Sequence, residues 1–282
     1  MTEAFAPGSL EEAVRLLGER PDLKPLAGCT DLMVAATPEE QADLPAVLDL
    51  LRIEELRGIR PLDGGLEIGA TTTFDAIGRS AEVARLFPIL AEAARVVGGW
   101  QIQTRATLGG NVVNASPAGD SLPVLLALDA TLVAVGPRGE RQIPYREFHV
   151  GYRRTALEPD ELLGWVRLPA PAPDSRQLFR KVGTREAQAI SKVVAAMTAV
   201  VAGGRIEGVR LAAGSVAPTP VRLTAVEEAV IGRAADAETA ELAARGAAEA
   251  VEPIDDVRST AGYRRFVLAR VVRRFLLRLG EG

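Results

Sequence analysis

Three prolines that lie close together divide this chain into two parts. Pro169, Pro171 and Pro173 fall within five residues, and proline lacks a backbone N–H group and clashes with the preceding helical turn. Neither a helix nor an inner strand can therefore run through this segment. With 282 residues the chain is long enough for two domains of ordinary size. We predict one domain over residues 1–173 and a second over residues 174–282.

Patterns of apolar residues predict helices and strands on both sides of this boundary. Ser9 precedes an acidic turn and apolar residues at helical spacing, which indicates a capped helix. Alternation of apolar and polar residues at 65–70 and 207–214 indicates strands. Because helices and strands mix in both parts, we predict an α+β protein. Further strands are predicted at residues 24–27, 46–50, 130–135, 161–168 and 177–181, and further helices at residues 31–36, 87–97, 237–251 and 263–279. Another helix is predicted to extend through Ile77, with Thr72 or Thr73 as its cap.

The charge balance and the absence of long apolar runs narrow the class of protein. A net charge of −4 and an isoelectric point near 5.4 argue against a general binder of nucleic acids or anionic membranes. No uncharged apolar run approaches the roughly 20 residues that cross a bilayer. The first seven residues lack the basic and apolar regions of a secretion signal. We therefore predict a cytoplasmic protein without a membrane span.

The single cysteine and the single histidine limit the chemistry of the chain. Cys29 alone can form neither an intrachain disulfide nor a cysteine-ligated zinc or iron–sulfur site, and His149 alone excludes a histidine-rich metal site. His149 also lies in a different motif from Cys29, so no histidine is predicted to activate the thiol as a nucleophile. We predict no metal site and no catalytic side chain, and any redox chemistry must come from an organic cofactor.

Two separate segments have the composition of anion-binding loops. Residues 27–32 read Ala-Gly-Cys-Thr-Asp-Leu, and residues 107–111 read Thr-Leu-Gly-Gly-Asn and are followed by Ser-Pro-Ala-Gly-Asp at 116–120. Glycine allows close backbone approach and positive φ angles, so successive loop N–H groups can converge on an anion. Together the two segments could hold one diphosphate. Because glycine and asparagine are also the usual turn residues, a simple hairpin or strand-edge turn at 109–111 is the alternative.

Six motifs in a fixed order resemble the FAD-binding (medium) subunit of the molybdenum hydroxylases, the family of xanthine dehydrogenase and aerobic carbon monoxide dehydrogenase. The resemblance extends from about Leu26 to Arg222 and continues weakly through the C-terminal helix. The motifs are residues 27–32, 107–111 and 116–120, Gly-Tyr-Arg-Arg-Thr at 151–155, Lys-Val-Gly-Thr-Arg at 181–185, and Gly-Ser-Val-Ala-Pro-Thr-Pro at 214–220.

This resemblance implies both a fold and a cofactor site. It implies an FAD-binding domain of the vanillyl-alcohol-oxidase (PCMH) type with two α/β subdomains, followed by a smaller α+β C-terminal domain. FAD is expected between the subdomains, with its diphosphate held by both glycine segments and with Asp120, Leu163 and Lys181 close to the cofactor. The residues that match the family's cofactor-binding positions are Ala27, Gly28, Cys29, Thr30, Asp31, Thr107, Gly109, Gly110, Asn111, Asp120, Leu163 and Lys181.

Two positions depart from the family pattern, and two matched residues have simpler alternative roles. Cys29 stands where the family usually has a second glycine, and Gln188 stands where an acid is common. Asp120 is also placed to cap a helix that begins at Ser121. Lys181 on a strand would ordinarily be solvated, whereas a lysine near the pyrimidine edge of a flavin would favour its anionic reduced form.

The resemblance implies an electron-transfer role in a complex. In the family, a large chain carries the molybdenum cofactor, a small chain carries two [2Fe-2S] clusters, and the flavin chain passes electrons to a terminal acceptor, in a dimer of heterotrimers. The alternatives are a stand-alone flavin oxidase of the same fold and a flavin-free assembly subunit. The substrate is selected on another chain, so neither the substrate nor the terminal acceptor can be predicted from this sequence.

Overall fold

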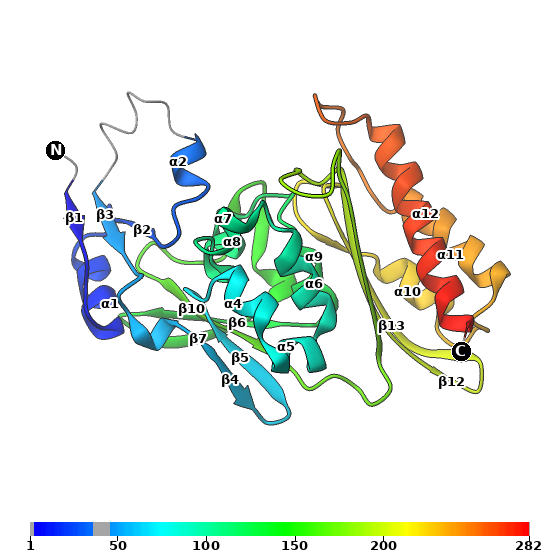
Figure 1. Cartoon of the computed structure of the whole chain (residues 1–282), viewed down its shortest axis with the longest axis horizontal. Helices are drawn as coiled ribbons and strands as arrows, with labels where there is room; N and C mark the ends of the chain where they lie inside the picture. Colours follow the sequence, from blue (N-terminus) through cyan, green and yellow to red (C-terminus); the bar gives the residue numbers. More distant parts are fainter. Residues whose placement is uncertain (1–2, 36–45, 282) are drawn as a thin grey trace.

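The computed structural model describes residues 3–35 and 46–281. The three larger of the four sheets follow one another along the long axis of the molecule, and helices lie against each of them (Figure 1). The buried apolar side chains form three clusters, and the central cluster also includes Ala196 and Ala212 of the third sheet. This arrangement confirms the predicted α+β class.

The first sheet is small and parallel. Its strands β1 (Ala4–Phe5), β3 (Val47–Asp49) and β2 (Lys24–Leu26) lie in the order β1-β3-β2. Helix α1 (Leu10–Glu19) covers it, and the Ser9 hydroxyl caps α1 by accepting a hydrogen bond from the N–H of Glu12 at 3.2 Å. Helix α2 (Leu32–Ala35) follows β2, and the predicted end of this helix at residue 36 lies outside the described residues.

The central sheet is antiparallel, in the order β4-β5-β10-β6-β7, and a group of short helices covers it (Figure 1). The largest side chains buried in the core of this unit include Phe74, Phe87 and Phe148, which lie outside the strands. The strands are β4 (Ile59–Leu62), β5 (Gly65–Gly69), β6 (Thr131–Gly136), β7 (Gly139–Pro144) and β10 (Leu162–Leu168). The helices are α4 (Phe74–Arg79), α5 (Ala81–Leu86), α6 (Pro88–Val96), α7 (Trp100–Gln103), α8 (Leu108–Asn114) and α9 (Leu122–Ala127), with short 3₁₀ turns at Glu54–Leu56 and Tyr145–Glu147 and a hairpin of β8 (His149–Gly151) and β9 (Arg154–Thr155).

The third sheet is antiparallel and lies between two layers of helices. Its strands β11 (Arg176–Val182), β12 (Val193–Ala202), β13 (Arg205–Gly214) and β14 (Val221–Arg222) pair in chain order. Helices α6 and α9 of the central unit contact one side, and α10 (Thr224–Val230) and α12 (Ala261–Gly280) contact the other, with α11 (Ala237–Glu249) packed on both of these helices (Figure 1). The core is thus shared across the junction.

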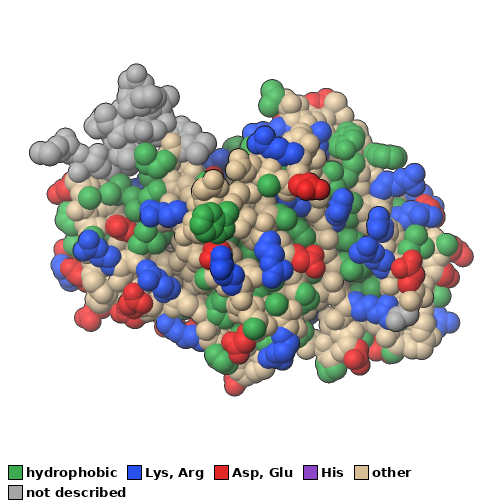
Figure 2. Space-filling model, viewed as in Figure 1, with side chains coloured by type: hydrophobic (Ala, Val, Ile, Leu, Met, Phe, Trp, Pro, Cys, Tyr) green, Lys and Arg blue, Asp and Glu red, His purple; other side chains and the backbone are tan. Residues whose placement is uncertain are grey.

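Residues 169–175 contain neither helix nor strand and connect β10 to β11, as the three prolines predict. On the visible face, acidic and basic side chains are interspersed over all three units (Figure 2). No helix within residues 3–35 and 46–281 is both long enough and apolar enough to cross a membrane.

Candidate functional site

The two glycine-containing segments lie against each other although about 80 residues separate them in sequence. A Cβ atom added to Gly28 would lie 2.0 Å from the carbonyl oxygen of Arg105, so only glycine permits this backbone contact. The Asn114 amide, at the end of α8, donates a hydrogen bond to Asp31 Oδ2 at 3.1 Å. Residues 27–31, which we call the first turn, therefore lie along α8. Gly28 contacts Arg105, just before α8 begins, and Asp31 contacts Asn114, where α8 ends.

The second segment is the beginning of a helix, which corrects its interpretation as a loop or hairpin turn. Thr107 caps α8, because its hydroxyl accepts a hydrogen bond from the N–H of Gly110 at 3.1 Å. The N–H groups of Leu108 and Gly109 donate to the carbonyl oxygens of Thr72 and Ala70, at 3.0 and 2.8 Å. These amides are used within the protein, so residues 108–110 do not form a nest of free N–H groups.

The paired glycines of α8 have different surroundings. Gly109 is buried, and a Cβ atom there would lie 2.6 Å from Ala70 Cβ and 2.7 Å from its carbonyl oxygen. Gly110 is exposed, and the only atom near its added Cβ would be Thr107 Oγ1 at 2.9 Å. Neither glycine has a left-handed φ angle. Gly109 is therefore required for packing, whereas Gly110 leaves the exposed face of α8 without a side chain at this position.

The first turn supplies the free backbone donors that α8 lacks. The N–H groups of Gly28, Cys29, Thr30 and Asp31 have no partner among the described residues. Cys29 has a φ angle of 61°, and successive amides on either side of a left-handed residue form a concave anion-binding nest. Free N–H groups that could converge on an anion were expected in both glycine segments, but the first turn has them and residues 108–110 do not.

A left-handed angle is most easily adopted by glycine, which is the residue that the resemblance leads one to expect at the position of Cys29. The thiol donates a hydrogen bond to the carbonyl oxygen of Ala27 at 3.2 Å. Partial burial is the main cause of a raised pKa for the Cys29 thiol, with a further contribution from Asp49. The thiol is therefore protonated at neutral pH, which does not suit a nucleophile.

Comparison of two substitutions tests the strain at this position. Cys29→Gly is expected to be more stable than Cys29→Ala by about 1 kcal/mol, because both lose the thiol but only glycine is relaxed at this angle. Urea unfolding of the two flavin-free variants measures the difference. If alanine proved as stable as glycine, the left-handed angle would not be a source of strain.

Asp120 and Lys181 form a buried ion pair beside α8. Lys181 Nζ lies 2.6 Å from Asp120 Oδ2 and also donates to the carbonyl oxygen of Val96 at 2.8 Å, and each of the paired side chains is only 8% exposed. The Ser191 hydroxyl donates to Asp120 Oδ1 at 2.5 Å. Lys181 is therefore not solvated, and Asp120 is held by a lysine and a serine. Burial raises the pKa of Asp120, whereas Lys181 and Ser191 act in the opposite direction.

Ser121, which follows Asp120 in the chain, connects the neighbourhood of this pair to α8. The Ser121 hydroxyl donates to Asn111 Oδ1 at 2.7 Å, and Ser121 is fully buried. This bond leaves the Asn111 amide nitrogen without a partner among the described residues. Leu163, on β10, is 5% exposed and belongs to the same apolar cluster as Leu108, so its side chain lies in the core on which α8 packs.

Several residues of this arrangement were not predicted from the sequence. Ser121 was considered only as the start of a helix, and Ser191, Asn114 and Arg105 had no assigned role. The motifs at 107–111 and 181–185 adjoin these residues, but only the folded chain shows that Asn114 reaches the first turn and that Ser191 reaches Asp120. Within the described residues no group of three or more histidine, cysteine, aspartate or glutamate side chains is arranged to hold a metal ion.

Comparison with known proteins assigns both parts of the chain. Residues 1–171 match the family model described as the FAD binding domain in molybdopterin dehydrogenase. Residues 178–279 match the model described as the CO dehydrogenase flavoprotein C-terminal domain. The predicted boundary between residues 173 and 174 lies in the interval between these matches.

Individual relatives match over nearly the whole chain. The carbon monoxide dehydrogenase medium chain of Hydrogenophaga pseudoflava is 32% identical over 280 residues, covering 97% of this chain and 95% of the relative. The nicotinate dehydrogenase FAD-subunit of Eubacterium barkeri is 34% identical and covers 85% of this chain and 82% of its own.

Solved structures give the same assignment. A carbon monoxide dehydrogenase structure from Hydrogenophaga pseudoflava superposes with a TM-score of 0.91 at 33% identity and covers 97% of this chain and 95% of its own. Quinoline 2-oxidoreductase from Pseudomonas putida 86 gives 0.91 at 27% identity and covers 100% and 98%. The domain matches, the relatives and the superpositions agree with the order of motifs in the sequence. This chain belongs to the family of FAD-binding medium subunits of the molybdenum hydroxylases, and it is an oxidoreductase subunit.

Proposed function

We propose that this chain holds FAD between its first turn and α8 and acts as the electron-transfer subunit of a molybdenum hydroxylase complex. The observation that carries the proposal is the contact of Gly28 with the backbone at Arg105, which brings the two glycine segments together. A dinucleotide needs donors for its diphosphate and a surface that its atoms can approach closely. Both are present where these segments meet.

The residues around this contact fit a diphosphate. The free N–H groups of residues 28–31 are suited to bind its oxygens, and the Thr30 hydroxyl lies in the same turn. Gly110 lets a ligand approach α8, and the unpaired Asn111 amide nitrogen is an additional donor. Asp31 contributes by fixing the turn to Asn114, and Thr107 by capping α8.

The remaining matched residues fix the elements around the proposed site. The Asp120–Lys181 pair fixes the beginning of α9 relative to β11, and Lys181 has one further N–H group to offer a ligand. Leu163 contributes apolar core below α8. When bound, FAD would supply both one-electron and two-electron transfer. The task of the protein is to bind and orient it, and no side chain is assigned as a nucleophile or general base.

We propose that a small iron–sulfur chain delivers the electrons and that a large molybdenum chain oxidises the substrate, in a dimer of heterotrimers in the cytoplasm. The printed names of the relatives, such as medium chain and FAD-subunit, support a division of labour between chains. The presence of one cysteine in the whole sequence requires any cysteine-ligated cluster to lie on another chain.

Purification tests the proposal. The tagged chain, isolated from its native host, is expected to carry FAD and to retain two partner chains, one with iron–sulfur and one with molybdenum cofactor. Visible spectra, metal analysis and mass spectrometry of the partners measure this. A folded chain without flavin bands would instead support an assembly subunit. Rapid reduction of FAD in the isolated chain by a small substrate would support a stand-alone oxidase.

A further inference from the structure

A short turn before α12 holds apolar side chains out in solvent. In this turn, residues 256–259, the N–H of Asp256 donates to the carbonyl oxygen of Ser259 at 3.1 Å, and the N–H of Ser259 donates back at 3.2 Å. Val257 in the turn is 99% exposed, and Ile254 just before it is 71% exposed. Apolar side chains that remain in water bury no surface within the chain, so these two do not stabilise its fold.

Hydrogen bonds hold this turn in one conformation. Asp256 Oδ1 accepts from two backbone N–H groups of the turn, at 2.9 and 3.0 Å, and from Nη2 of Arg264 at 2.8 Å. Arg264 is buried, and its Nη1 also donates to the carbonyl oxygens of Lys192 and Ser215, at 2.9 and 2.8 Å. Because the turn is already fixed, it loses little conformational entropy when a partner binds to it.

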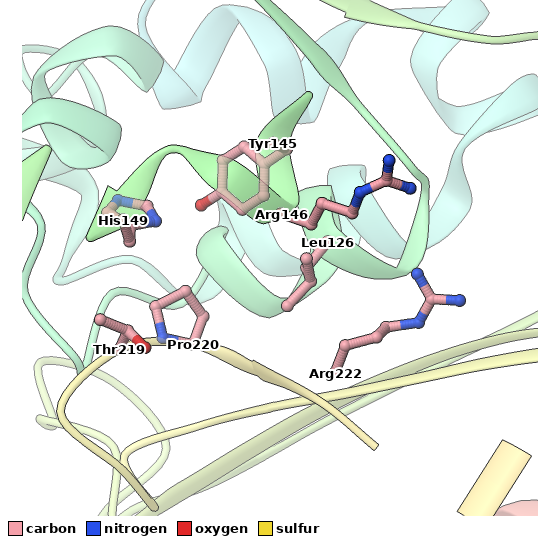
Figure 3. A pocket seen from close by; sticks show the side chains of 7 residues that line it. All are labelled: Leu126, Tyr145, Arg146, His149, Thr219, Pro220 and Arg222. Atoms are coloured by element: carbon pink, nitrogen blue, oxygen red, sulfur yellow. The ribbon is translucent and has the colours of Figure 1, made fainter. Parts of the chain in front are cut away.

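The segment that Arg264 binds at Ser215 is itself attached to the central unit. The N–H of Ser215 donates to the carbonyl oxygen of Pro117 at 2.8 Å. Farther along this segment, Thr219 lines the same small cavity as Tyr145 of the central unit (Figure 3). Through Arg264, the turn is therefore connected to both parts of the chain.

Two exposed aromatic rings follow the turn, and a cation lies over each of them. Tyr263 is 43% exposed and Phe266 is 58% exposed, both near the beginning of α12. Lys192 Nζ lies 5.2 Å from the centre of the Tyr263 ring, and Arg270 Cζ lies 5.4 Å from the centre of the Phe266 ring. Neither cation is paired with a carboxylate among the described residues.

The charge of α12 indicates what kind of partner fits. The helix carries six arginines and no acidic residue, and Arg270 and Arg274 are exposed one turn apart. Figure 2 shows hydrophobic side chains over the beginning of α12 and basic side chains farther along it. The neighbouring acids Asp255 and Asp256 accept hydrogen bonds within the turn and from the start of α12. A second copy bound through the same surface would bring these cations together, so the surface favours a different chain that carries carboxylates.

We propose that a docking surface for an acidic segment of a partner protein is formed by Ile254, Val257, Tyr263, Phe266, Lys192 and Arg270. Apolar side chains of the segment pack on Val257 and on the two rings, and its carboxylates pair with Lys192 and Arg270. Exposed apolar groups with polar residues around them are typical of protein–protein interfaces. The docking surface is defined by residues outside the proposed FAD site, so this proposal does not depend on bound FAD.

Photo-cross-linking of the full chain in its native host tests the docking surface. A benzophenone amino acid replaces Val257 in one variant and, as the control, Ile231 in another; Ile231 is exposed in the same unit but lies outside the docking surface. Only the first variant is expected to form a cross-link, to a segment of another protein that contains apolar and acidic residues. Mass spectrometry of the linked peptide identifies the segment. A link to a second copy, to nucleic acid or to a segment without carboxylates, or a yield no higher than that of the control, would overturn the proposal.

Reversal of one charge gives a second test. Arg270→Glu is expected to lower the cross-linking yield from position 257 about tenfold, because it places like charges across the contact. Arg270 is exposed and has no carboxylate partner, so the variant should keep its fold and its flavin content. Replacing the acid of the partner that lies nearest the link by arginine should restore the yield. An unchanged yield in Arg270→Glu, or no recovery after the second replacement, would contradict the pairing of this surface with carboxylates.

Discussion

Replacing Gly110 by leucine is expected to give a folded protein that no longer retains FAD. The position is exposed, and an added Cβ would meet only Thr107 Oγ1, so the fold tolerates the side chain apart from a local adjustment of the cap. A leucine there would occupy the surface by which the dinucleotide approaches α8. We expect affinity for FAD to fall on the order of a hundredfold. The flavin-to-protein absorbance ratio, with circular dichroism to verify folding, measures the effect.

The neighbouring glycine provides the matched control. Gly109→Ala places a Cβ 2.6 Å from Ala70 Cβ, in contact that neither backbone can easily relieve. This variant should lose about 1–3 kcal/mol of unfolding free energy, whether or not FAD is present. The two substitutions thus distinguish an effect on the stability of the fold, at Gly109, from an effect on FAD binding, at Gly110. Stoichiometric flavin in a folded Gly110→Leu protein would contradict the assignment of this surface of α8 to the cofactor.

Among the substitutions considered, removal of the Lys181 amine is expected to lower the free energy of unfolding most. Lys181→Met leaves the Asp120 carboxylate buried with only Ser191 as a partner, and breaking one side of a buried ion pair costs about 3–5 kcal/mol. The double variant Asp120→Asn, Lys181→Met removes the lone charge and should recover much of this loss. Urea unfolding of the two variants and the unmodified chain gives the comparison. A double variant less stable than Lys181→Met would show that the unpaired charge is not the cause.

The same variant should change its stability with pH in a defined direction. Burial raises the pKa of Asp120, and Lys181 is the largest opposing influence. Without the lysine, the folded protein binds the proton of Asp120 more tightly than the unfolded chain does. Protonation of Asp120 therefore stabilises the folded variant at low pH, and this stabilisation is lost as the pH rises through the folded-state pKa of Asp120. The stability gap between Lys181→Met and the unmodified chain should narrow on acidification.

Local sequence signals predicted several elements of the fold correctly. Ser9 caps a helix as expected, and of the two candidate caps Thr72 and Thr73 the structure has Thr73. The proline-rich segment between residues 169 and 173 is free of regular structure. These predictions succeed because capping and proline geometry act within a few residues. The alternation at 65–70 and 207–214 likewise identifies β5 and β13.

The errors have local and long-range causes. The glycines of residues 107–111 predict a loop, but Thr107 is a strong N-cap and a helix follows it. A solvated Lys181 was only the alternative to its match with a cofactor-binding position, and that alternative is wrong. The burial of Lys181 depends on Asp120, 61 positions earlier, and on the carbonyl oxygen of Val96. The left-handed angle of Cys29 is also set by tertiary contacts of its turn, since cysteine by itself does not favour it.

The buried pair spans the junction, because Asp120 precedes the three prolines whereas Lys181 and Ser191 follow them. Recombinant chimeras that join one half of this chain to the other half of a relative inherit a constraint from it. Such a hybrid must have an acid, an amine and a hydroxyl at the positions of Asp120, Lys181 and Ser191. Otherwise an unpaired charge is buried where the two halves meet. The sequences that can be exchanged between members of the family are therefore limited by three side chains that lie away from the molecular surface.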